Sequence, residues 1–236
     1  MHQVVAIGGS FGAMHVLLKI VRALPRELNG TLLVVTHIGA RKSALAEILA
    51  KDCRIPVRDA QDGEQLLPGL VLIAPPDRHM LVSEDGGSIR LHDGPKENHT
   101  RPAIDPLFRS VAKAYGARAA GVILTGYLED GVAGLRAIKS SGGYAMVQDP
   151  AEAAASSMPM LALESVAVDL CLRSGDIGAE IVRRVADGSR AESQAEPQAE
   201  PQAEPEAGAD ALQGAGLHNF PAGGMWRGQE LIMPTE

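Results

Sequence analysis

Short apolar segments alternate with amphipathic helical segments over residues 1–188 of this chain. The apolar segments do not alternate polar with apolar residues, so both faces of each strand have to be covered. Helical segments between consecutive strands supply that cover and return the chain for parallel pairing. The pattern predicts an α/β fold, a doubly wound, mostly parallel sheet with helices on both faces in three layers. We expect strands over 4–7, 31–36, 71–74, 119–124 and 144–148.

Helix starts are indicated by capping residues. We expect helices over 14–23, from Ser43 as N-cap to about 51, from Asp105 to about 115, and over 131–141. Asp accepts hydrogen bonds from the free N–H groups of a first helical turn, and proline suits the first helical position. Asp105 followed by Pro106 therefore predicts a helix with Asp105 as its N-cap. The turn Asp85-Gly86-Gly87, between two short apolar segments, predicts a small β-hairpin.

The acidity of the chain is concentrated at one end. The formal net charge is −7, and residues 189–236 contain two arginines and eight acidic residues, which leaves 1–188 with a net charge of −1. Three Gln-Ala-Glu-Pro repeats over 194–205 exclude a continuous helix and offer little to bury. We expect a domain over 1–188 and an acidic tail over 189–236 that is disordered to about 216. The apolar end around Trp226 is either a frayed terminus or a short peptide that docks a partner.

Composition and segment length disfavour several classes of protein. No segment approaches the roughly 18 apolar residues of a membrane-spanning helix, so we expect a protein that is not inserted in a membrane. The chain starts directly in a strand-like segment without a secretory leader, and its two cysteines suggest reduced thiols. We therefore expect a cytoplasmic protein. The acidic balance argues against nucleic-acid binding, which requires a basic face.

The turn after the first expected strand carries a serine between glycines. Gly8-x-Ser10-x-Gly12 fits the pattern of a nucleophile elbow, in which glycines permit a sharp strand-to-helix turn that exposes the serine. The same five residues are compatible with a purely structural glycine turn. They are also compatible with a phosphate-binding loop at a helix N-terminus. This turn alone does not decide among the three.

Polar residues at two other strand ends favour acyl-transfer chemistry. A dinucleotide site needs different glycine spacing and an acidic residue at the end of the second strand, where this chain has His37. A neutral imidazole beside Ser10 can accept its proton near pH 7. Asp130 is the candidate carboxylate that orients His37, and on spacing alone it is equally compatible with an N-cap of the following helix. The order Ser, His, Asp differs from the Ser, Asp, His order of α/β-hydrolases.

The remaining histidines and cysteines suggest no second centre. His79 and His92 flank the hairpin, His99 lies in a polar loop, and no two of them have the spacing of metal ligands on a helix. Cys53 has neither a nearby histidine nor a Cys-x-x-Cys partner, so a thiol enzyme is not expected.

Taken together, the motifs resemble the catalytic domain of CheB-type protein-glutamate methylesterases, the chemotaxis enzymes. The resemblance extends from Val4 to about Leu172, and its motifs follow the family's order. They are the Gly-x-Ser turn at Ser10, the strand that ends in His37, and the segments 72–79, 101–108, 124–131, 148–150 and 158–159.

The resemblance implies a serine hydrolase that demethylates glutamate γ-methyl esters on the cytoplasmic helices of chemoreceptors. Deamidation of receptor glutamines is implied as a second reaction. Ser10 matches the family nucleophile, His37 the base and Asp130 the orienting carboxylate. The backbone N–H groups of Phe11 and Tyr127 correspond to the oxyanion donors. No metal or cofactor is required, and the implied partner is a methylated chemoreceptor.

Two departures from the family keep alternatives open. The family turn Thr-Gly-Met-Gly-x-Asp-Gly is replaced by one with Tyr127 and Leu128, which puts a side chain where a glycine takes φ > 0 without strain. The chain also has no room before its first strand for the receiver domain that family members often carry, so we expect a stand-alone enzyme. One alternative is a binding or scaffold module in which Leu128 blocks Ser10. The other is an esterase or amidase for a different protein substrate.

Overall fold

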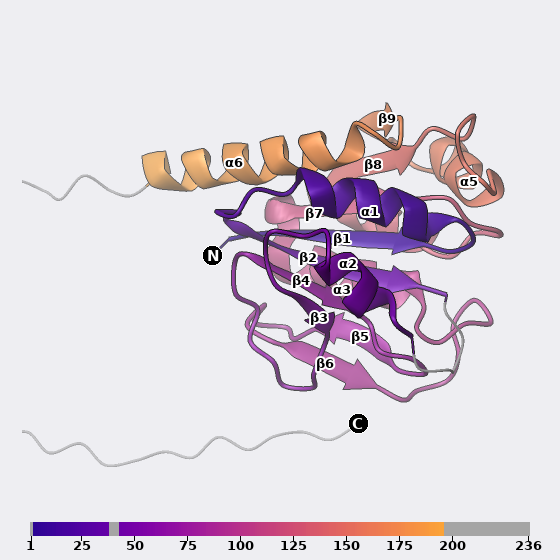
Figure 1. The fold of residues 1–236 in the computed structure, drawn as a ribbon, viewed down its shortest axis with the longest axis horizontal. Coiled ribbons are helices and arrows are strands. Elements are labelled where there is room, and N and C mark those ends of the chain that lie inside the picture. Colours follow the sequence, from indigo (N-terminus) through magenta and orange to yellow (C-terminus); the bar gives the residue numbers. More distant parts are fainter. Residues whose placement is uncertain (1, 38–42, 196–236) are drawn as a thin grey trace, which may run out of the picture. The chain divides into compact units, whose positions relative to one another are not determined.

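The computed structural model describes residues 2–37 and 43–195, with only the backbone from 189 onward. Seven strands form one sheet in which every neighbouring pair is parallel (Figure 1). In spatial order they are β3 (Val57–Asp59), β4 (Leu70–Ile73), β2 (Gly30–Thr36), β1 (Gln3–Gly9), β7 (Ala119–Ile123), β8 (Tyr144–Gln148) and β9 (Leu170–Leu172). The predicted parallel α/β sheet is confirmed.

The central strands are buried on both faces because their side chains feed two separate cores. Val4 and Ala6 of β1 belong to one core, whereas Val5 and Ile7 belong to the other. This is the consequence of the two-residue period of a strand whose residues are all apolar.

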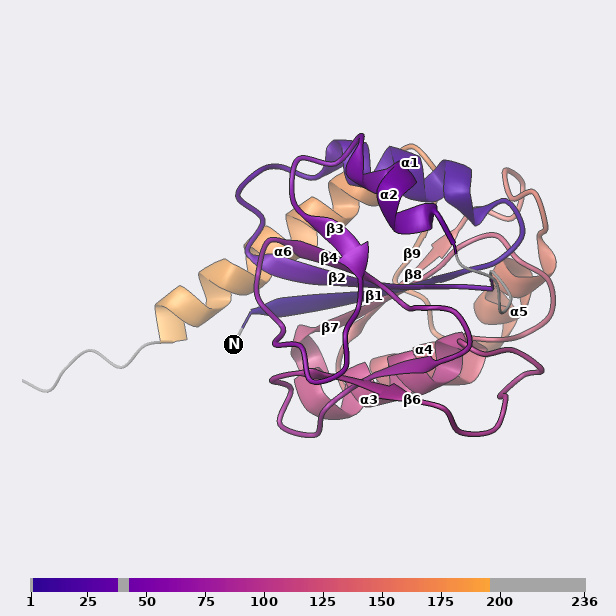
Figure 2. The ribbon, with the colours of Figure 1, turned by 60° about the horizontal axis from the view of Figure 1, so that its bottom comes forward.

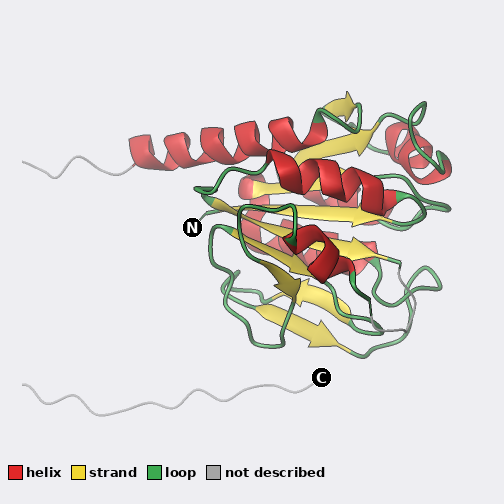
Figure 3. Cartoon of the chain, viewed as in Figure 1, coloured by secondary structure: helices red, strands yellow, loops and turns green. Residues whose placement is uncertain are grey.

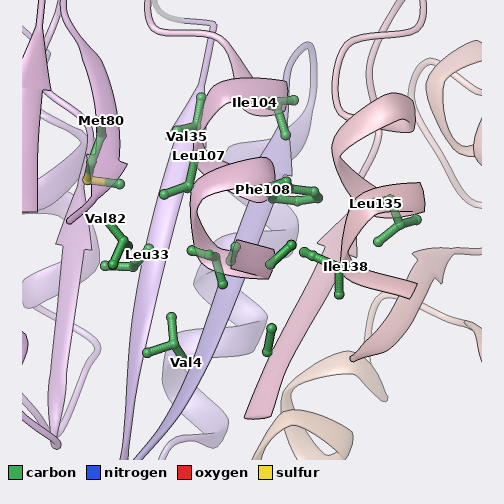
Figure 4. Close-up of a cluster of buried hydrophobic side chains, with 14 of the residues drawn as sticks. Val4, Leu33, Val35, Met80, Val82, Ile104, Leu107, Phe108, Leu135 and Ile138 are labelled. Atoms are coloured by element: carbon green, nitrogen blue, oxygen red, sulfur yellow. The ribbon is translucent and has the colours of Figure 1, made fainter. Parts of the chain in front are cut away.

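Helices cover both faces of the sheet, as predicted (Figure 2). One face is covered by α1 (Ala13–Ala23), α2 (Leu45–Ala50) and α6 (Ile177–Ala195). The other is covered by α3 (Ile104–Tyr115), which ends in the 3₁₀ turn Gly116–Arg118, by α4 (Val132–Ser140) and by α5 (Ser157–Ser165). Figure 4 shows Phe108 of α3 and Leu135 of α4 within this second core.

The predicted hairpin consists of β5 (His79–Val82) and β6 (Ile89–His92), which pair antiparallel outside the main sheet. Met80, Val82 and Ile89 join the core beneath α3, so the hairpin extends that layer (Figure 4). All strands of the main sheet point the same way, and the loops that follow them gather at one edge (Figure 3). That edge is where the side chains predicted to be functional lie.

The prediction that Asp105 is the N-cap of its helix is wrong. Helix α3 begins at Ile104 with Ala103 as its N-cap, so Asp105 lies inside the first turn. Its buried side chain faces α4 instead of its own helix end. Ser43 lies one position before the N-cap of α2, and its Oγ accepts a hydrogen bond from the Leu45 N–H.

The predicted tail begins within a helix. Helix α6 continues to Ala195, past the boundary expected at 188. Residues 196–236, with the repeats after Glu196 and the apolar end around Trp226, lie outside the described residues, so the division at 188 and the docking peptide remain predictions. Among the described helices, none has the length and apolar character needed to cross a bilayer.

Candidate active site

Ser10, His37 and Asp130 come from three strands that are neighbours at the centre of the sheet. Ser10 directly follows β1, His37 directly follows β2, and Asp130 lies in the turn between β7 and α4. Because β1 pairs with β2 on one side and β7 on the other, the chain changes direction across the sheet at β1. Loops on either side of such a switch point leave a crevice at the carboxyl edge, where ligands bind in open α/β sheets.

The three side chains form a continuous chain of hydrogen bonds. His37 Nδ1 lies 3.2 Å from Ser10 Oγ, and His37 Nε2 lies 2.7 Å from Asp130 Oδ2. Since an ionised carboxylate only accepts, Nε2 carries the proton and Nδ1 is left to accept the proton of the serine hydroxyl. The structure therefore brings together all three residues that the sequence suggested for catalysis.

Asp130 is held ionised in a buried position. Its side chain is 2% exposed and accepts hydrogen bonds from His37, from the backbone N–H groups of Ile104 and Asp105, and from the Asn98 amide. Burial alone would raise the pKa of the carboxyl, but the bonds from His37, Ile104 and Asn98 outweigh it, and the pKa lies below its ordinary value. A stable negative charge is thus placed behind the imidazole.

The capping role considered for Asp130 exists, but at a different helix. Helix α4 has Gly131 as its N-cap and is not capped by Asp130, whose carboxylate accepts the Ile104 N–H at 2.7 Å and the Asp105 N–H at 3.1 Å. These are two of the free N–H groups at the start of α3. The capping contacts fix the carboxylate without using the hydrogen bond to His37.

The turn that carries Ser10 depends on glycine at one position. Gly12 is the N-cap of α1 with φ +82°, and a Cβ there would lie 2.6 Å from the Ala154 Cβ. Ser10 itself has no left-handed backbone, so the left-handed residue in this turn is Gly12 rather than the serine. The Ser10 N–H donates to the Thr125 carbonyl at 2.9 Å, which ties the turn to the end of β7.

Phe11 and Tyr127 stand beside the serine. Neither backbone N–H donates to an acceptor within the described part of the chain. A Cβ on Gly126 would lie 2.9 Å from the Ser10 Cβ, so the backbone that leads into Tyr127 passes close to the serine. Both side chains are 59% exposed and their ring centroids are 5.7 Å apart, which makes an aromatic rim next to Ser10.

Three cavities bear on where a substrate could react. One of about 270 Å³ borders His37 but not Ser10, with Arg101 in its wall. A cavity of about 170 Å³ lies beside Ser10 and His37, with Met14 and Leu45 in its wall. A larger one of about 630 Å³, lined in part by Arg90 of the hairpin, is bounded by none of the three site residues. The cavity of about 170 Å³ is the candidate reaction site because, of the three, it borders both the serine and the imidazole.

Leu128 does not block the serine. It adopts φ +66°, the strained conformation expected where the family has glycine. Its side chain is 66% exposed and takes no part in the wall of the cavity beside Ser10. Leu128 thus does not fill the space at Ser10, as the scaffold alternative required.

Several supporting residues were not identified from the sequence. Thr125 Oγ1 donates to the Phe11 carbonyl at 3.0 Å, and Gln148 Oε1 accepts the Thr125 N–H at 2.8 Å, so both brace the serine turn. Asn98 contacts Asp130 from the polar loop before α3. The strand-end position of Gln148 was a usable signal, whereas nothing in the sequence connected Asn98 with Asp130.

The contacts of His79 and the burial of Cys53 indicate structural roles for both residues. His79 is buried, with Nε2 3.0 Å from the Pro95 carbonyl oxygen and Nδ1 accepting the Ala103 N–H at 3.2 Å. Burial raises the pKa of the Cys53 thiol, which keeps it protonated and unreactive. In the ranges 2–37 and 43–195, no three His, Cys, Asp or Glu side chains are grouped as metal ligands would be.

The chain is a doubly wound α/β domain with a hydrogen-bonded serine, histidine and aspartate at the carboxyl edge of its sheet. Residues 5–181 match the model of the CheB methylesterase family, and the chain belongs to that family. The crystal structure of the Thermotoga maritima CheB methylesterase catalytic domain superposes with a TM-score of 0.75 at 30% identity. That alignment covers 78% of this chain and 98% of the Thermotoga chain.

Two relatives are similar to this chain in sequence. Protein-glutamate methylesterase/protein-glutamine glutaminase 2 of Anaeromyxobacter dehalogenans is 43% identical over 176 residues, which are 74% of this chain and 51% of that protein. The protein-glutamate methylesterase/protein-glutamine glutaminase of Escherichia coli K12 is 37% identical over 190 residues, which are 79% of this chain and 54% of that protein. The chain thus spans about half the length of these two relatives.

Proposed function

We propose that this protein is a serine hydrolase that demethylates glutamate γ-methyl esters on chemoreceptors. The observation that carries the proposal is the hydrogen-bonded chain from Ser10 through His37 to Asp130, in a chain that belongs to the CheB methylesterase family. The family membership supports the ester as substrate, and the chain of hydrogen bonds supports the chemistry.

In the first step, Ser10 Oγ attacks the ester carbonyl carbon as its proton moves to His37 Nδ1. The imidazolium that forms is stabilised by Asp130, whose Oδ2 accepts the Nε2–H. The carbonyl oxygen becomes an oxyanion, and the free N–H groups of Phe11 and Tyr127 are the donors we assign to it. Phe11 directly follows Ser10, and Tyr127 follows Gly126, whose backbone passes close to the serine.

Collapse of the tetrahedral intermediate breaks the bond to the methoxy oxygen. His37 Nδ1–H protonates that oxygen, methanol leaves, and a glutamyl ester of Ser10 remains. Water then attacks this ester with His37 as base, which releases the glutamate carboxylate and restores the serine. With a glutamine side chain the same steps release ammonia, so deamidation needs no additional group.

The proposed partner is the methylated helix of a chemoreceptor, and the proposed location is the cytoplasm, where those helices lie. A methyl ester on a helix surface is reached by an enzyme whose nucleophile stands at an open edge. The exposed Phe11 and Tyr127 rings beside Ser10 offer an apolar surface to such a helix.

The test is methanol release from methylated receptor by the full chain. Ser10→Ala is expected to lower release by at least about a thousandfold, while Ser140→Ala, at the exposed end of α4, keeps the wild-type rate. Equal release by wild type and Ser10→Ala would refute the assignment. Release of ammonia from receptor glutamines, measured with the same variants, tests the second reaction.

A further inference from the structure

Asn98 lies between two buried carboxylates. Its Nδ2 is 2.7 Å from Asp130 Oδ1 and 2.8 Å from Asp105 Oδ2. Carboxylate oxygens only accept, so the nitrogen rather than the oxygen of the amide must face them, and its two N–H groups are divided between them. No other side chain in the described ranges bonds to both.

The backbone around Asn98 is built to present this amide. Glu97 and Thr100 exchange backbone hydrogen bonds of 3.2 and 2.9 Å across a tight turn. Asn98 and His99 occupy its central positions with φ +50° and +64°, a conformation that asparagine tolerates better than most residues. The left-handed backbone is unfavourable, so the surrounding contacts must stabilise it.

Three anchors hold the segment that carries this turn. Glu97 forms a two-pronged ion pair with Arg109 of α3. Arg101 donates to the Asp93 and Gly94 carbonyls at 2.8 and 2.7 Å, and it also pairs with Asp77. His79 bonds at both ring nitrogens to Pro95 and Ala103. The segment that carries Asn98 is thus anchored by contacts that do not involve the two carboxylates.

The two carboxylates would otherwise repel one another. Burial raises the pKa of Asp105, and the charge of Asp130 adds to that effect, whereas the Gly134 N–H and Asn98 oppose it. Arg109 is the cation that lies near both carboxylates. Within the described residues, the acidic side chains around Arg109 are those of Glu97, Asp105 and Asp130. An amide that donates to both carboxylates keeps each in place without adding charge.

We propose that Asn98 is a positioning residue for catalysis, which occupies Asp130 Oδ1 so that Oδ2 stays directed at His37 Nε2. The two backbone donors place one N–H on each oxygen, and the one on Oδ1 is the longer bond, at 3.1 Å. The Asn98 bond to the same oxygen, at 2.7 Å, completes the restraint on rotation about the Cβ–Cγ bond. Asn98 acts through Asp130 and His37 and touches no reacting atom. The inference rests on the proposed function, because it requires Ser10 to be activated by His37.

The variant that tests this is Asn98→Gly, which deletes the amide and keeps a residue that accepts φ > 0. His99→Gly is the matched control, since it changes the neighbouring residue of the same turn, also at φ > 0, and removes an exposed side chain. Asn98→Ser keeps one hydroxyl donor in place of two N–H groups. Each is made in the full chain and compared by thermal unfolding.

The first readout is the rate at which a serine-directed phosphonate labels Ser10. Asn98→Gly is expected to slow labelling about tenfold through misorientation of the imidazole, with Asn98→Ser intermediate and His99→Gly within about twofold of wild type. The second is the pH midpoint of labelling, which we expect to move to lower pH in Asn98→Gly. A carboxylate whose Oδ2 turns away from Nε2 stabilises the protonated form of the imidazole less.

These readouts separate this proposal from the proposed function. Methanol release can fail in the wild type while labelling still depends on Asn98, and only the substrate assignment is then lost. A folded Asn98→Gly that labels at the wild-type rate with an unchanged midpoint overturns the positioning role. If Asn98→Gly does not fold, wild-type labelling by Asn98→Ser at an unchanged midpoint overturns it equally.

Discussion

Asp105 and Asp130 cap each other's helices. Asp130, two residues before α4, accepts the Ile104 and Asp105 N–H groups at the start of α3, while Asp105 in α3 accepts the Gly134 N–H in the first turn of α4 at 2.6 Å. The exchange ties the turn after β7 to α3. The carboxylate that bonds to His37 is consequently also a structural link between two helices, and its loss should lower stability as well as the proposed activity.

Asp130 is expected to stabilise the fold at neutral pH and to lose that effect in acid. Its folded pKa lies below the ordinary 3.8, so its contribution is present above that pH and disappears as the pH falls through the lower, folded value. We expect Asp130→Asn to cost about 1.5–3 kcal/mol at pH 7, since several charge-assisted bonds are lost. Urea unfolding at pH 7 and near pH 3 measures the difference, and a gap that does not shrink in acid contradicts the prediction.

Asp105 is expected to have the opposite pH dependence. Its folded pKa is raised by burial and by the charge of Asp130, so wild type gains stability as the pH falls from 7 through that raised value toward 3.8. Asp105→Asn cannot bind this proton. As the pH falls from 7 to about 4, the difference in stability between wild type and Asp105→Asn should therefore grow in favour of wild type. The difference in stability between wild type and Asp130→Asn should stay constant over the same range. Equal slopes for the two variants would count against both assignments.

Gly12→Ala tests the turn that carries the serine. Gly12 and Gly63 have similar φ, +82° and +76°, but a Cβ on Gly12 meets the Ala154 Cβ at 2.6 Å while a Cβ on Gly63 has nothing within 4 Å. Gly63→Ala should cost about 1 kcal/mol for the left-handed backbone alone. Gly12→Ala should cost roughly 1–3 kcal/mol more, since the contact cannot relax without moving the turn. Chemical denaturation of both variants decides, and equal losses would show that the contact is relieved cheaply.

Leu128→Gly is expected to stabilise the protein. A leucine at φ +66° costs about 1–2 kcal/mol, whereas glycine costs about 0.5–1 kcal/mol in backbone entropy. Because the Leu128 side chain is exposed, its removal loses little hydrophobic stabilisation. The net expectation is a gain of about 0.5–1 kcal/mol. Leu67→Gly is the control, because Leu67 is also exposed, at 56%, but has no positive φ. It should lose stability, and a loss in both variants would contradict the strain at Leu128.

The meeting of the three candidate site residues could be predicted from the sequence because the relevant rule is simple. Parallel strands end at one edge, so Ser10, His37 and Asp130, each after a buried apolar segment, had to lie near one another. Asn98 follows no strand, and it reaches Asp130 only through a tight turn and the packing of α3 against α4. Such contacts between distant segments have no local signature.

The sequence predicted neither the edge strands β3 and β9 nor the helices α5 and α6, and it misassigned Asp105. Strands β3 and β9 are short edge strands without a fully buried residue, and such segments lack the continuous apolar pattern of the central strands. Asp105 was assigned to its own helix because Asp-Pro is a strong local start signal. Its side chain instead satisfies the N-terminus of a helix that lies far along the sequence, which local reasoning cannot anticipate.

Tyr127→Ala tests the aromatic rim as a surface for the protein substrate. If a receptor helix rests on the Phe11 and Tyr127 rings, the loss of one ring should raise KM for methylated receptor about three- to tenfold and leave phosphonate labelling of Ser10 nearly unchanged. Leu67→Ala is the control, since Leu67 is comparably exposed but its carbonyl accepts from Thr31 at the start of β2, which places it at the opposite edge of the sheet. Steady-state methanol release measures both. An unchanged KM in Tyr127→Ala would remove the ring from substrate binding, and a parallel loss of labelling would move its role to the serine turn.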